Sequence, residues 1–170
     1  MIALSTIKKA LKIDYTTDDQ ELLRIRDAAL AFIEQYTGLT IQTKSKVAYL
    51  QYWMKTSLDL PFNSVTSVKY YDTSGTLTTM PSTDYWIDRS CDPSYYINFL
   101  EYPSVKEGTQ IMVTYSTGYS VLPKEIEQVA IGLIGAWYNN PEATAPISLS
   151  VVPLSCMFIL DNMKAKAVVS

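Results

Sequence analysis

The clearest periodic pattern in the chain covers residues 18–37, where apolar side chains recur every three or four positions. These positions are Leu22, Ile25, Ala29, Phe32, Ile33 and Tyr36. Such spacing places them on one face of a helix. Thr17 and Gln20 have the spacing of a capping box, and Gly38 stands where a left-handed residue commonly ends a helix. The pattern therefore predicts an amphipathic helix over 18–37.

A second long helix is predicted over 123–139, because Pro123 suits a helix start and the apolar positions again follow helical spacing. They are Ile126, Val129, Ala130, Leu133, Ile134 and Trp137. Gly132 and Gly135 would each weaken an isolated helix by about 1 kcal/mol relative to alanine. Close packing against another helix explains them, and helix 18–37 is the expected neighbour, through Ala29, Phe32 and Ile33. A short helix over 5–13, capped by Ser5, is also expected.

Between these helices the period of the pattern changes to two, which is typical of strands. The alternating positions include Val47 and Tyr49, Val68 and Tyr70, Tyr85 and Ile87, and Tyr95, Ile97 and Phe99. Turn signals separate them, among them the hairpin-like sequence DTSG at 72–75. The pattern predicts short antiparallel strands in a β segment over 41–115. The fold class is therefore α+β, with two long helices, short terminal helices and an inserted antiparallel β segment.

After Pro141 the sequence no longer follows a regular helix or strand pattern, and a short apolar helix is then predicted over 154–163. We therefore expect one domain over 1–140, which already holds enough elements for a closed core, and a C-terminal arm over 141–170. Apolar side chains in that arm need a surface to cover them. The predicted partner interface is Leu154, Met157, Phe158, Ile159, Leu160 and Lys164.

Composition narrows the class of protein. The 170 residues include 14 basic and 17 acidic side chains, for a net charge of −3, which disfavours general attraction to nucleic acid or anionic membranes. The first residues do not resemble a signal peptide. The longest charge-free stretch, 143–160, contains two prolines and several hydroxyl residues, which disfavours a membrane span.

The residues offer little for catalysis. Without histidine, the usual catalytic triads and zinc sites cannot form, and no glycine-rich phosphate loop occurs. The best metal candidate is the set Asp84, Asp88 and Asp92, for which a solvated edge is the preferred interpretation. Cys91 and Cys156 are expected to be free thiols. We predict no catalytic, metal or cofactor-binding residue, no cofactor and no enzymatic activity.

Two further patterns have competing interpretations. Glu101 and Glu107 flank a proline-containing loop and could in principle serve glycoside hydrolysis, but nothing in the sequence indicates that they face each other, and surface charge is the preferred interpretation. Lys44 and Lys46, with Tyr49 and Tyr52, could bind single-stranded nucleic acid, since aromatic rings stack on bases and lysines hold phosphates. In an acidic chain, an exposed edge strand protected by lysines is preferred.

The order of segments then suggests a family. A helix ending in QYTGLTIQ is followed by LPFNSVTSVKYYDTSG, then VTYSTGY, then LPKEIEQVAIGLIGAWYNNPE. This order resembles the head-tail connector (adaptor) proteins of tailed phages, the gp6-like family, and in particular its longer branch with a β insertion. The resemblance covers residues 4–142.

The resemblance implies a structural virion protein of the neck, made and assembled in the host cytoplasm. Relatives form a ring, a dodecamer, that docks under the portal protein, completes the DNA-filled head and offers a platform to tail or stopper proteins. DNA passes through the lumen without sequence-specific binding. In relatives the C-terminal segment engages the portal, often ending in a Tyr-Arg pair where this chain has residues 161–164. The alternatives are another tail-completion or baseplate protein and, less favoured, a small hydrolase.

Overall fold

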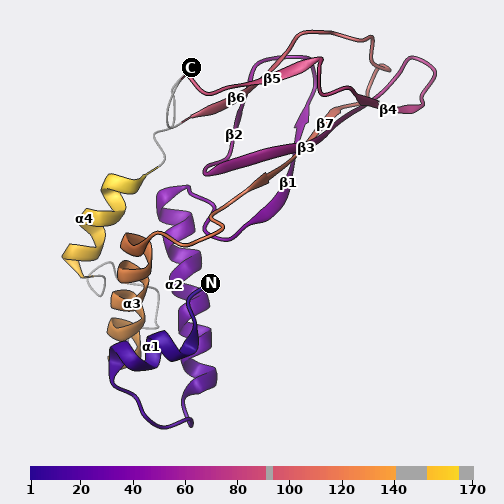
Figure 1. Cartoon of the computed structure of the whole chain (residues 1–170). Helices are drawn as coiled ribbons and strands as arrows, with labels where there is room; N and C mark the ends of the chain where they lie inside the picture. The colour runs from indigo at the N-terminus through magenta and orange to yellow at the C-terminus, as the bar shows by residue number, and fades with distance from the viewer. Residues whose placement is uncertain (91–93, 141–152, 165–170) are drawn as a thin grey trace. The chain divides into compact units, whose positions relative to one another are not determined.

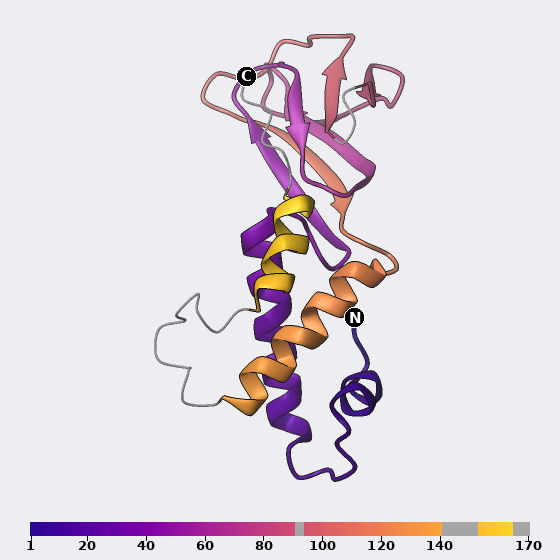
Figure 2. The ribbon, with the colours of Figure 1, turned by 90° about the vertical axis from the view of Figure 1, so that its left-hand side faces the viewer.

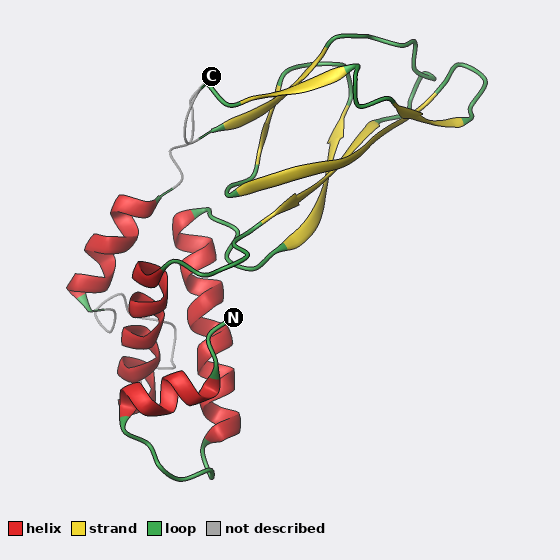
Figure 3. Cartoon of the chain, in the orientation of Figure 1, coloured by secondary structure: helices red, strands yellow, loops and turns green. Residues whose placement is uncertain are grey.

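The computed structural model describes residues 1–90, 94–140 and 153–164, and its elements divide into two compact units (Figures 1 and 3). The helical unit takes Met1–Ile41 and the described residues of Tyr119–Ala165, and the β unit takes the described residues of Gln42–Gly118. The helices are α1 (Leu4–Leu11), α2 (Asp19–Thr37), α3 (Lys124–Asn139) and α4 (Leu154–Met163). The strands are β1 (Lys44–Leu50), β2 (Thr56–Leu58), β3 (Phe62–Tyr71), β4 (Leu77–Met80), β5 (Tyr85–Asp88), β6 (Tyr95–Phe99) and β7 (Ile111–Thr117). The α+β class is confirmed.

Helix α2 packs against α3, as the apolar stripes predict (Figure 2). Ala29 and Ile33 of α2 and Ala130 and Leu133 of α3 are all fully buried. At the edge of this contact the ring of Phe32 meets that of Trp137 edge to face, with centroids 6.0 Å apart. Burying side chains of this size contributes about 1.5–3 kcal/mol each, so the helix pair forms the core of its unit.

The ends of α2 follow the prediction at one terminus only. Gly38 is left-handed, with φ 72°, and its N–H donates to the Glu34 carbonyl at 3.0 Å. At the start, the N-cap is Asp18, and no side-chain cap bond forms, so the expected capping box of Thr17 and Gln20 is wrong. Asp18 has φ −101° and ψ 8°, outside the extended region that N-caps usually adopt. Its carboxylate instead accepts a hydrogen bond from the hydroxyl of Tyr138.

The expected neighbour of the α3 glycines is also wrong. A Cβ at Gly132 would lie 3.1 Å from Sγ of Cys156 in α4. A Cβ at Gly135 would lie 2.9 Å from Cδ2 of Leu11 in α1. The glycines therefore lie on the flanks of α3, where α4 and α1 approach, and larger residues fill its contact with α2.

The short first helix begins one residue earlier than expected. Its N-cap is Ala3, without a side-chain cap bond, so Ser5 lies inside the helix and does not cap it. Ile7 is fully buried and anchors α1 to the helical unit. Lys12 ends the helix in a left-handed conformation with φ 58°.

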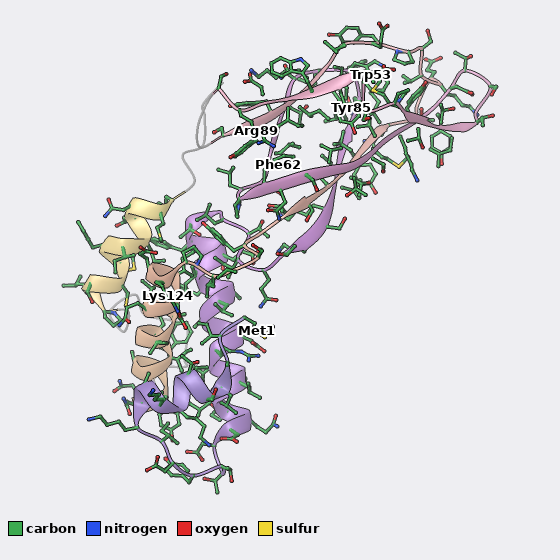
Figure 4. All side chains as sticks on the ribbon, in the orientation of Figure 1. Met1, Trp53, Phe62, Tyr85, Arg89 and Lys124 are labelled. Atoms are coloured by element: carbon green, nitrogen blue, oxygen red, sulfur yellow. The ribbon has the colours of Figure 1, made fainter. Side chains whose placement is uncertain are left out.

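The β unit contains two antiparallel sheets, with strand orders β1-β7-β3-β4 and β2-β6-β5. Their inner faces share one core that includes Val68 and Val113 from the first sheet and Ile97 from the second, all fully buried. Trp53, labelled in Figure 4, lies in the β unit. It makes edge-to-face contacts with Tyr70 and Phe99, at centroid distances of 5.3 and 5.0 Å. The segment predicted over 41–115 is therefore a β-sandwich.

The hairpin between β3 and β4 uses the predicted turn. Gly75 has φ 85°, and its N–H donates to the Asp72 carbonyl at 2.8 Å. The Asp72 carboxylate also accepts from the N–H groups of Ser74 and Thr76, at 2.9 and 3.0 Å. These bonds to the charged form hold the pKa of Asp72 below its usual value, with the Ser74 hydroxyl as the largest cause.

The two ends of the β unit lie next to each other. Lys44 pairs with Thr117 across β1 and β7. Gly118 follows with φ 107°, and a Cβ there would lie 2.3 Å from the carbonyl oxygen of Gln42. Only glycine combines this φ with so close an approach of two backbone segments.

Candidate partner-binding surface

Helix α4 carries the predicted interface residues, and its inner side is covered by its own chain. The helix starts after Pro153, whose carbonyl accepts from the N–H groups of Cys156 and Met157 at 2.9 and 3.2 Å. It packs against α2 and α3. Cys156 and Leu160, one turn apart, face inward, and Leu160 is fully buried. Cys156 and Leu160 of α4 therefore belong to the helical core, and the expectation that residues 1–140 suffice for a closed core stays a prediction.

The Cys156 thiol fits the flank of α3 that Gly132 leaves open. Its Sγ lies 3.9 Å from the carbonyl oxygen of Val129, a weak contact of the kind that buried thiols make. Burial raises the pKa of the thiol. Cys156 is free, and Cys91 lies outside the described residues, so the prediction that both thiols are unbridged stays a prediction.

A small polar cluster fastens the end of α4 to α2. Tyr36 donates its hydroxyl to Asp161 at 2.7 Å, and the ammonium of Lys164 lies 2.8 Å from the same carboxylate oxygen. Lys164 also lies 4.2 Å from the centroid of the Tyr36 ring. The bond from Lys164, and then that from Tyr36, lowers the pKa of Asp161, while Asp161 raises the pKa of Lys164. We call these three residues the α4 latch.

The outer side of α4 is apolar and open to solvent. Leu154 is 88% exposed and Phe158 is 71% exposed, and their spacing of four places them on one face. Met157 and Ile159 are half-buried beside them. Large apolar side chains so exposed on one helix face are typical of a surface that a partner covers.

The six predicted interface residues therefore fall into three groups. Leu154 and Phe158 are exposed, and Met157 and Ile159 form the margin of the same surface. Leu160 is in the core of the helical unit, so it faces its own chain. Lys164 is engaged in the α4 latch. We define the α4 surface as Leu154, Met157, Phe158 and Ile159; its role in binding stays a prediction.

The acidic candidate for a metal site does not assemble among the described residues, where no group of three metal-ligating side chains occurs. Asp88 accepts hydrogen bonds from the N–H and hydroxyl of Ser90, at 2.9 and 2.6 Å, and from Lys55 at 2.9 Å. These bonds, those of Ser90 first, lower the pKa of Asp88 to about 2. Asp84 accepts from the hydroxyl of its neighbour Thr83 at 2.8 Å. Asp92 lies outside the described residues.

Within β1, the two lysines do not share a face with Tyr49. Residues of a strand alternate between its two sides, so Lys44 and Lys46 lie on the side opposite to Tyr49. Lys46 is held by Asp59 at 2.7 Å, near the inner side of the sheet. The stacking surface for single-stranded nucleic acid would need lysine and tyrosine on the same side.

No helix in the part of the chain that the structure describes has the length and apolar character to cross a bilayer.

Comparisons with known proteins agree with the resemblance drawn from the sequence. Residues 1–76 match the family model described as phage gp6-like head-tail connector protein, so the resemblance is confirmed over that part of the chain. No curated protein sequence matches the chain.

The fold is shared with chains of solved neck structures. One belongs to the neck of an empty GTA particle computed with C6 symmetry, with a TM-score of 0.79, 18% identity, and coverage of 99% of this chain and 92% of that one. A second belongs to the virion of a native gene transfer agent (GTA) particle, with a TM-score of 0.79, 19% identity, and coverage of 99% and 92%. A third belongs to the neck of a native GTA particle computed with C12 symmetry, with a TM-score of 0.74, 19% identity, and coverage of 98% and 90%.

Proposed function

We propose that this chain is a head-tail connector subunit in the neck of a phage-like particle. The observation that carries the proposal is the match of residues 1–76 to gp6-like head-tail connector proteins. The fold shared with GTA neck chains over nearly the whole length supports it. Both point to a structural part and away from an enzyme.

In this role several copies form a ring, and the ring sits in the virion neck. The symmetry of the similar neck structures, C6 and C12, supports an assembly of repeated subunits. Twelve copies is the number we propose. The net charge of −3 suits a lumen through which DNA slides without sticking.

The ring binds the portal protein on one side and offers a platform to the tail or stopper protein on the other. We assign portal binding to the α4 surface, because Leu154 and Phe158 are the large apolar side chains of α4 that the described residues of the chain leave exposed. Burial of each on a partner would contribute about 1.5–3 kcal/mol. Assembly of this kind takes place in the host cytoplasm.

The experiment compares particles made with the wild-type chain, with Phe158→Asp and with Val121→Asp. Val121 is 81% exposed in the helical unit but outside α4, so it is a matched control for adding a carboxylate at an exposed apolar position. Particles are purified from cells in which the variant is the only copy, and heads and tails are counted by negative-stain imaging. Far-UV circular dichroism checks that both variants fold.

We expect Phe158→Asp to give DNA-filled heads without tails and without the connector, and Val121→Asp to give complete particles. Particles that are complete without any copy of this chain would end the proposal of a connector. Complete particles with Phe158→Asp would contradict the assignment of portal binding to the α4 surface. Loss of the chain from baseplates or tail tips, with necks intact, would favour the tail-completion or baseplate alternative.

A further inference from the structure

The outer face of the four-stranded sheet has little charge. The strand registers align Tyr49 with Met112 and Met112 with Lys69 in one row. Val47 aligns with Thr114 in the next row. Directly opposed residues of an antiparallel pair point to the same side, so these side chains share one face. Val47 is 42% exposed and Tyr49 is 59% exposed, so this face is open to solvent.

This face continues onto the outer strand β4, where Tyr71 aligns with Leu77, which is 46% exposed. Lys69 is the single charged side chain in these rows, and it forms no ion pair within the described residues. In a chain with 18% charged residues, a solvent-facing sheet surface of tyrosine, methionine, valine, leucine, serine and threonine is unusual. Depletion of charge with enrichment in tyrosine and methionine is typical of the buried centre of protein interfaces.

The opposite side of the sandwich presents a second face of different chemistry. On the three-stranded sheet, Trp86 aligns with Asn98, and Asp88 aligns with Tyr96. Trp86 is 48% exposed. Lys55 joins this face by its ion pair with Asp88 at 2.9 Å and lies 4.5 Å from the centroid of the Tyr96 ring. The face therefore combines aromatic rings with a neutralised pair of charges.

One polar atom of this second face is left without a partner. The side-chain nitrogen of Asn98 is buried and makes no hydrogen bond within the described residues. Because this nitrogen is buried beneath the face, the surface that a partner would meet is formed by the side chains around it, chiefly Trp86, Tyr96 and Lys55.

We propose that the four-stranded face of one copy packs against the three-stranded face of the next copy in the ring. The two faces lie on opposite sides of one sandwich, which is the arrangement that a head-to-tail contact needs in order to repeat around a ring. Their chemistry also agrees: the ammonium of Lys69 on the first face would meet the exposed ring of Trp86 on the second, and cations interact favourably with aromatic rings. The inference rests on the proposed ring and adds the surfaces that form it.

The test places the photo-cross-linking residue p-benzoylphenylalanine at Tyr49 in one variant and at Trp86 in another. Both positions are aromatic and exposed, so the replacement is close in size. Assembled particles are irradiated and the products are identified by mass spectrometry of the cross-linked peptides. An exposed position in the helical unit, Val121, is the control.

We expect the Tyr49 variant to give a dimer of this chain linked to the peptide that carries β5 and β6. The Trp86 variant should give the reciprocal dimer, linked to β1, β7 or β3. A product with a different virion protein, a dimer linked elsewhere, or no dimer from particles that contain the variant would each overturn the proposal. If a variant at Tyr49 is not incorporated, the same measurement from Leu77 decides the question.

The two proposals fail in different ways. A wild-type chain that is absent from particles contradicts the connector role itself. A chain that is present in the neck but cross-links to other surfaces contradicts only the pairing of these two faces.

Discussion

Replacing Leu160 with alanine tests whether α4 belongs to the core of the helical unit in the free subunit. Leu160 is fully buried, against helices that lie more than twenty positions away in sequence. The substitution removes most of the side chain and leaves a cavity between α4, α2 and α3. Because the cavity is walled by packed helices, the neighbouring side chains can fill it only in part.

The expected cost is about 2–5 kcal/mol, as for other leucine-to-alanine changes at fully buried positions. With a urea m-value of about 2 kcal/mol/M, the unfolding midpoint falls by about 1–2.5 M. The assay is equilibrium unfolding in urea followed by circular dichroism at 222 nm, which reports mainly on the helices. The β unit is followed separately by the fluorescence of Trp53, whose ring is packed in the sandwich core, in a chain with the other tryptophans replaced by phenylalanine.

Phe158→Ala is the matched control on the same helix. Phe158 is 71% exposed, so its truncation should change stability by no more than about 0.5 kcal/mol. A midpoint for Leu160→Ala equal to that of the control would refute the reasoning. It would mean that α4 is undocked in solution and that its contacts with α2 and α3 do not contribute to the stability of the free chain.

Three further outcomes are expected. Gly118→Ala should destabilise the β unit by well over 1 kcal/mol, and by more than the control Gly108→Ala. Both glycines have positive φ, but only at Gly118 would the added Cβ lie 2.3 Å from a backbone atom. Equal urea midpoints for the two variants would contradict this prediction. The pKa of Asp88 is lowered to about 2, so its contribution to stability is full above the unfolded value near 4 and disappears as the pH falls toward 2. The difference in melting temperature between wild type and Asp88→Asn should therefore be constant above pH 5 and close between pH 4 and pH 2. In a Cys91→Ser chain, iodoacetamide should label Cys156 slowly at pH 8 and rapidly in urea, because burial raises the pKa of the thiol and blocks access to it. For the wild-type chain, we expect an intact mass that reductant leaves unchanged, as unbridged thiols require.

The features that the sequence predicts well are those with local signals. The two long helices are marked by apolar positions on one side and by end residues such as Gly38, and the hairpin at 72–75 is marked by its own turn residues. The capping box failed although its spacing was correct. The carboxylate of Asp18, the actual N-cap residue, accepts a hydrogen bond from Tyr138, which lies 120 positions away. The local sequence gives no signal for such a contact.

The orientation of α4 is the other feature that could not be predicted. Its residues are apolar on almost every side, so the pattern alone does not distinguish Leu160, which is buried, from Phe158, which is exposed. The distinction depends on the position of Gly132 and on the α4 latch, whose members Tyr36 and Asp161 lie 125 positions apart. Sequence spacing carries no information about contacts at this separation.

The closeness of the two ends of the β unit has a consequence for how such proteins change over generations. Gln42 and Gly118 are in contact. The chain therefore leaves and re-enters the helical unit at nearly the same point, so a short turn between α2 and the segment before α3 could take the place of the β unit. Genetic exchange with breakpoints at these two positions could replace the whole sandwich while every helix keeps its place in the chain. Lineages could in this way acquire new contacts for one unit without redesigning the other. A graft of residues 42–118 from a distant relative, tested for folding of the helices, would measure how freely that exchange can occur.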